Sequence, residues 1–79
     1  MPWYLFVWDP ETEKHLAEHG VTADEFEQVV CNPDALGESR TSGRPIAFGY
    51  SETGKYLACI YEQLDADTIQ PITAYEVND

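Results

Sequence analysis

The stretch WDPETEKHLAEHGVTADEFEQVVCNP, residues 8–33, decides the fold, because it predicts two short helices joined by a tight turn. Asp9 is a favoured N-cap residue, so the first helix is expected to begin directly after it. Gly20 is placed to end that helix in a left-handed conformation. Thr22 and Glu25 have the spacing of a capping box, which predicts the start of a second helix.

The second helix is expected to end before Pro33. Phe26, Val29 and Val30 recur at the spacing that places side chains on one helix face, which predicts an apolar stripe that faces a core. Asn32 followed by Pro33 is a typical stop signal, because proline cannot continue the helix.

Most of the remaining chain predicts strands. Residues 3–8 are nearly all apolar, which favours a strand that is buried on both faces and central in a sheet. Residues 45–50 and 56–63 alternate in the manner of strands, and residues 68–77 form the last predicted strand. Pro71 interrupts this last strand, which indicates an edge position or a bulge.

The order strand, helix, helix and then an antiparallel meander of three to four strands predicts one α+β domain over residues 1–79. Both helices are expected to pack on one face of a twisted antiparallel sheet that includes the first strand. A fourth meander strand would lie near residues 37–40. The expected core consists of Leu5, Val7, Leu16, Phe26, Val29, Val30, Phe48, Leu57, Cys59 and Ile60.

The composition limits the classes of function. The chain has 79 residues, 15 acidic and 4 basic side chains, and a formal net charge of −11. This charge repels nucleic acid and anionic membranes, so we expect no tight binding to double-stranded DNA or RNA. No stretch is suited to span a bilayer and no signal peptide is visible, so we expect a cytoplasmic protein. Cys31 and Cys59 are expected to be buried, reduced thiols.

Two short motifs flank the first predicted helix: Phe-Val-Trp-Asp at residues 6–9 and His-Gly-Val at residues 19–21. Together with the aromatic strand, they resemble the BrnT-type ribonuclease toxin family of the RelE/ParE-like superfamily. The resemblance implies a RelE/BrnT-toxin-like arrangement of the elements. BrnT-type toxins are generally basic, with a basic residue near the final strand, where this chain has Tyr75 and Glu76.

A second set of motifs extends over nearly the whole chain. It consists of His15 on the first helix, Val-Val-Cys-Asn-Pro at residues 29–33, Gly-Arg at residues 43–44 and Ile-Thr-Ala-Tyr at residues 72–75. These motifs resemble an uncharacterised family of small bacterial domains related to the BrnT-type toxins. We favour this second group because the chain is strongly acidic. With this group, we expect a toxin-like domain that binds a small anion or a protein partner.

The second resemblance also implies a site. His15, Arg44, Thr73 and Tyr75 match its motif residues, and we expect them to converge on one depression at the end of the sheet. His15 would act as base or acid, Arg44 would hold an anion, and Thr73 with Tyr75 would orient it. From the residues alone, Arg40 and Arg44 lie among serine, threonine and glycine in a loop over residues 39–45 that could hold an anion, or they could pair with Glu38 or with helix carboxylates. A small phosphate or carboxylate suits this charge balance, and no cofactor is predicted.

The first alternative is a ribonuclease toxin of a toxin–antitoxin system that cleaves RNA with His15 and Arg44. Such cleavage needs a base, an acid and cations facing the developing phosphorane charge. The competing interpretation of the same residues is a structural hydrogen-bond cluster that ties the last strand to the first helix.

Two further alternatives concern metals and proteins. His15 and His19 lie four residues apart on one helix face and could share a zinc ion, but a zinc site needs three or four protein ligands, so no metal is predicted. A basic protein partner, or a second copy of the chain, could bind through the sheet edge that Pro71 marks.

Overall fold

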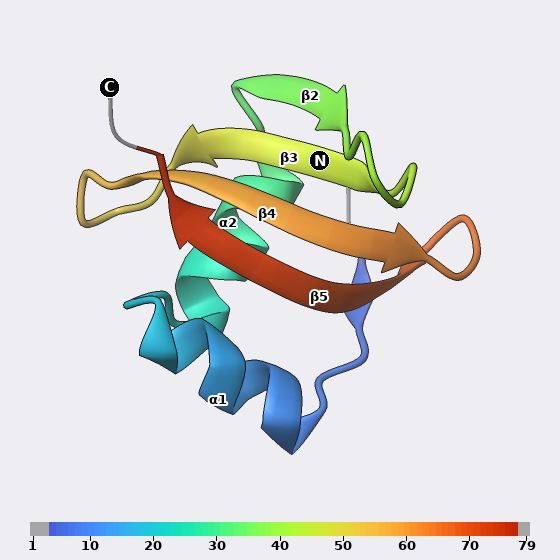
Figure 1. Ribbon diagram of the computed structural model, residues 1–79, viewed down its shortest axis with the longest axis horizontal. Coiled ribbons are helices and arrows are strands. Elements are labelled where there is room, and N and C mark those ends of the chain that lie inside the picture. The colour runs from blue at the N-terminus through green and yellow to red at the C-terminus, as the bar shows by residue number, and fades with distance from the viewer. Residues whose placement is uncertain (1–3, 78–79) are drawn as a thin grey trace.

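The structure is a computed structural model that describes residues 4–77. It contains two helices and one five-stranded mixed sheet with the strand order β1-β5-β4-β3-β2, which confirms the α+β class (Figure 1). In chain order, the elements are β1 (Leu5–Phe6), α1 (Pro10–Glu18), α2 (Ala23–Cys31), β2 (Ala35–Glu38), β3 (Pro45–Tyr50), β4 (Tyr56–Gln63) and β5 (Thr68–Glu76).

Local capping fixes both helices at the predicted positions. The Asp9 carboxylate accepts the Glu11 N–H at 2.8 Å and so begins α1. Thr22 and Glu25 form the expected capping box, in which each side chain accepts the other residue's backbone N–H. Gly20 adopts a φ of 75° in the turn between the helices, a conformation that glycine adopts without strain.

α2 covers one face of the sheet and α1 lies along the margin of β5, and the main core forms between the sheet and these helices. Figure 1 shows α2 behind the central strands and α1 along the outer margin of β5. Phe26 and Val29 of α2 are fully buried, as is Leu16 of α1. The main core cluster consists of Leu16, Val21, Phe26, Val29, Val30, Ala47, Leu57, Cys59, Tyr61, Ile69 and Ala74.

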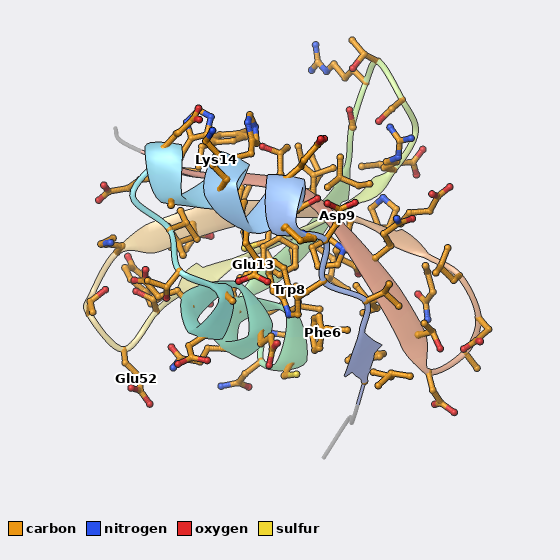
Figure 2. The ribbon with its side chains drawn as sticks, turned by 90° about the horizontal axis from the view of Figure 1, so that it is seen from below. Phe6, Trp8, Asp9, Glu13, Lys14 and Glu52 are labelled. Carbon is orange, nitrogen blue, oxygen red and sulfur yellow. The ribbon has the colours of Figure 1, made fainter. Side chains whose placement is uncertain are left out.

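The N-terminal strand differs from its prediction. β1 has only two residues, lies at the sheet edge and runs parallel to β5, so the sheet is not antiparallel throughout. Leu5 and Val7 were predicted as core but are 56% and 42% exposed. Phe6 and Trp8 pack on the core instead, and Figure 2 shows both between β1 and α2. The chain pairs briefly with β5 and then turns to begin α1, so only one of its faces is covered.

Two further residues that were predicted in the core are less buried than expected. Phe48 and Ile60 are only half-buried, because the strand alternation directs them to the face that carries no helix. The other six predicted core residues are buried: Leu16, Phe26, Val29, Val30, Leu57 and Cys59.

Pro71 marks a bulge. The pairing between β4 and β5 shifts between Ile60, which faces Thr73, and Tyr61, which faces Pro71, so Ile72 is the extra residue. The outer strands of the sheet are β1 and β2 rather than β5. Within the described residues, β1 pairs with β5 only at Thr68 and Ile69, so the outer margin of β5 at Pro71 has no strand partner, as expected. The edge strand β2 is exposed at every residue.

Both cysteines of the described chain are free thiols. Cys59 is buried as predicted, whereas Cys31 at the end of α2 is only half-buried. Between residues 4 and 77, no helix is long and apolar enough to cross a membrane.

Candidate functional site

The strand register separates the sheet into two faces. Ala47, Cys59 and Ala74 are paired across β3, β4 and β5, are fully buried and belong to the core under the helices. Because side chains alternate along each strand, their neighbours point the other way, to a face that neither helix covers. We call this the helix-free face, and it consists of Ile46, Phe48, Tyr50, Tyr56, Ala58, Ile60, Thr73 and Tyr75.

Aromatic rings dominate one end of the helix-free face. Tyr50 and Tyr56 are paired residues whose ring centroids lie 4.7 Å apart, and Phe48 stacks on Tyr56 at 6.5 Å with an interplanar angle of 13°. Ala58 is paired with both Phe48 and Tyr75, and it is fully buried although no helix covers it. The rings therefore pack on one another and make a small apolar layer of their own.

This layer keeps polar atoms at its surface. The Tyr56 hydroxyl donates to the Asp34 carboxylate at 3.4 Å. Burial, together with the charge and hydrogen bond of Asp34, raises the pKa of Tyr56, so its phenol remains a neutral donor at pH 7. Tyr50 is 67% exposed and Tyr75 43% exposed. Large rings with wet hydroxyl groups are typical of surfaces that bind other molecules.

The predicted site residue His15 meets one margin of this face. Its Nε2 lies 3.0 Å from the Thr73 hydroxyl, so the pair forms a hydrogen bond between α1 and β5. The His19 ring stands edge-on to the His15 ring, with 4.9 Å between centroids. Both imidazoles are exposed, so this pair is open to solvent and to a ligand.

The structure joins only part of the predicted site. Thr73 and Tyr75 lie on the same face, two residues apart along β5, and Thr73 contacts His15. Arg44 precedes β3, which β4 separates from β5, and within the described chain its buried Nε has no hydrogen-bond partner. Arg40 is exposed in the turn between β2 and β3. Within the described residues, no hydrogen bond or ion pair joins either arginine to His15, Thr73 or Tyr75.

A buried carboxylate that the sequence suggested only as a cap ties α2 to the β3–β4 hairpin. Glu25 is 5% exposed and accepts the Thr53 hydroxyl at 2.7 Å and the Thr22 N–H at 3.0 Å. The Lys55 ammonium lies 3.4 Å from it and also donates to the Gly20 carbonyl at 2.7 Å. Burial raises the pKa of Glu25, but the hydrogen bonds and Lys55 outweigh it and lower the pKa to about 2. Glu25 is thus a structural anion, not a proton donor.

The described residues offer few other groups for metal binding or catalysis. Residues 4–77 contain no group of three or more side chains of the metal-binding types placed to hold an ion. Burial raises the pKa of the Cys59 thiol to about 12, so this cysteine is not a nucleophile at neutral pH. The chain matches no protein-family model, no curated protein and no solved structure.

The aromatic layer is the feature that sequence reasoning missed. The alternation of residues 46–50 and 56–60 showed two faces, but not which face the helices would leave open. A useful signal was the tyrosine content, because Tyr50, Tyr56 and Tyr75 all fall on the alternating positions that share the helix-free face.

Proposed function

We propose that this chain is a toxin-like, cytoplasmic protein-binding domain that docks a basic segment of another protein on its helix-free face. The observation that carries the proposal is the aromatic layer of Phe48, Tyr50, Tyr56 and Tyr75 on a sheet face without a covering helix. A segment that places apolar side chains on these rings would complete a second layer over the sheet.

The charge selects the kind of partner. The chain carries −11, so a basic segment is attracted to it and a second copy is repelled. Lysine and arginine side chains can also lie over exposed tyrosine rings, which favours a basic segment with apolar side chains between its charges. The preferred occupant is therefore a basic amphipathic segment rather than another copy of the chain.

The test uses an amphipathic peptide made of leucine and lysine, with a peptide of leucine and glutamate as the charge control. Isothermal titration of both peptides into the protein should show binding of the basic peptide only, and this binding should weaken as salt is added. Tyr75→Ser should weaken binding several-fold, because it removes one exposed ring of the face.

The matched control is Leu64→Ser, which also removes an exposed apolar side chain but lies in the turn after β4, outside the helix-free face. Equal losses in Tyr75→Ser and Leu64→Ser, or no binding of the basic peptide to the unaltered protein, would refute the proposal.

A second candidate, supported by the contact between His15 and Thr73 at 3.0 Å, is the ribonuclease toxin that the BrnT-type resemblance suggests. In it His15 would transfer the proton and Arg44 would hold phosphate. An RNA-cleavage assay decides: cleavage that disappears in His15→Ala supports this candidate, and an RNA that stays intact with the unaltered protein eliminates it.

A further inference from the structure

A hollow lies beside the helix-free face, between the last turn of α2 and the start of the β3–β4 hairpin. Its volume is about 380 Å³. The Glu52 N–H donates to the Gln28 side-chain oxygen at 3.1 Å and so holds the hairpin against the helix. We call this feature the α2 hollow, and it is lined by Gln28, Cys31, Asn32, Tyr50, Ser51 and Glu52.

Several sources of negative potential surround the α2 hollow. It opens at the carboxyl end of α2, where the backbone dipoles leave partial negative charge, and the last turn of the helix contains no basic residue to neutralise it. Glu52 is exposed at the rim, and Figure 2 shows its side chain extending outward from the hairpin. Glu27 does not line the hollow, and its carboxylate accepts the Trp8 indole N–H at 2.7 Å, but its charge still acts on Cys31.

The other lining groups are neutral and partly apolar. The Tyr50 ring is 67% exposed and offers an aromatic surface to a cation. Burial, reinforced by the charge of Glu27, raises the pKa of Cys31, so its thiol remains neutral and acts as a small apolar surface. Neither lysine nor arginine contributes to the lining, so the hollow offers no opposite charge to an anion.

We propose that the α2 hollow binds the guanidinium or ammonium group of a basic side chain. The aliphatic stem would lie against Tyr50 and Cys31, and the cationic head would lie between the carboxyl end of α2 and the carboxylate of Glu52. This inference rests on the proposed function, in that the cation would belong to the partner segment on the helix-free face. It adds a defined anchor: one lysine or arginine at the end of the segment that crosses Tyr50.

The experiment uses N-acetyl-arginine amide as the probe and its neutral analogue, N-acetyl-citrulline amide, as the control. Backbone amide shifts of the isotope-labelled protein are followed by NMR at fixed ionic strength. Saturable shifts at Gln28, Cys31 and Ser51 are expected with the arginine probe and not with the citrulline probe. An absence of shifts at these residues overturns the inference.

Two variants with the same net charge separate a defined anchor from general attraction to an acidic protein. Glu52→Gln should weaken arginine binding by about two- to fivefold, as expected for one exposed ion pair, and Glu62→Gln at the other end of β4 should leave it unchanged. Equal effects of both variants would mean unspecific attraction and would overturn the inference. If the arginine probe binds but the leucine–lysine peptide does not, the proposed function is refuted, whereas cation binding in the α2 hollow is supported.

Discussion

The two faces of the sheet are built from the same three central strands but differ in chemistry. The helix-covered face carries Leu57, Cys59 and Ala74, which have no strongly polar side-chain atoms and are fully buried. The helix-free face carries Tyr50 and Tyr75, whose rings are partly exposed. Amphipathic rings can shield a sheet and still face water, whereas aliphatic side chains need a covering layer. The helix-covered face therefore carries the main core, and the helix-free face is the one to which we assign the proposed binding.

The largest expected effect is on the helix-covered face. Phe26 is fully buried and contacts the rings of Phe6 and Trp8 at centroid distances of 6.4 and 5.5 Å. Phe26→Ala should lower the free energy of unfolding by about 3–5 kcal/mol, because it leaves a cavity where α2 meets the sheet. Urea denaturation measures this. A loss below that of Tyr75→Ala would show that the helix-free face carries the main core.

The sequence allowed local features to be predicted well. The caps at Asp9 and Thr22 and the left-handed turn at Gly20 involve residues within a few positions of each other, so the motif itself contains the interaction. The extent of the strand over residues 56–63 was also correct, because alternation is a property of the strand alone.

Features that depend on distant partners could not be predicted in this way. Leu5 and Val7 gave a continuous apolar run that indicated a central strand, but the helices cover only the side of Phe6 and Trp8. The hydrogen bond between His15 and Thr73 also joins distant residues, and it was expected from the resemblance of the motifs rather than from local geometry. The motifs do not encode the strand order on which the position of Arg44 depends.

The second prediction concerns the network that holds α2 against the β3–β4 hairpin. Glu25→Gln should lower the free energy of unfolding at pH 7 by about 2 kcal/mol. The buried carboxylate accepts charge-assisted hydrogen bonds from Thr53 and Lys55, and a neutral amide would lose them. Chemical denaturation at pH 7 measures this. Glu62→Gln, which removes an exposed carboxylate, should have little effect on the same measurement.

This second effect should depend on pH in a defined direction. The pKa of Glu25 is lowered from 4.5 to about 2 in the folded protein, so its stabilisation is fully present above pH 4.5. It is lost as the pH falls from 4.5 to 2, because the carboxylate of the unfolded chain takes up its proton before that of the folded protein does. The difference between the unaltered protein and Glu25→Gln should narrow in that window. A constant difference would contradict the ionised state of Glu25.

The third prediction concerns the contact between α1 and the margin of the helix-free face. His15→Ala and Thr73→Val should each lower the free energy of unfolding by about 0.5–1 kcal/mol if their hydrogen bond is structural, and the double variant should lose less than the sum. Thermal and urea unfolding of all four proteins measure the coupling. If the single variants are neutral for stability and His15→Ala abolishes RNA cleavage or anion binding, His15 is functional instead.

The variant Tyr50→Ser is expected to have the smallest effect on stability, although it should weaken binding strongly. The Tyr50 ring is 67% exposed and packs edge-on against Tyr56, so Tyr50→Ser should change the free energy of unfolding by only about 0.5 kcal/mol. Tyr50 also lines the α2 hollow and belongs to the helix-free face, so this variant should weaken both the leucine–lysine peptide and N-acetyl-arginine amide. Urea denaturation and titration of the same sample separate the two effects. If Tyr50→Ser loses binding only in proportion to its loss of stability, Tyr50 acts on folding and not on recognition. Tyr50 would then resemble the side chains of the helix-covered face.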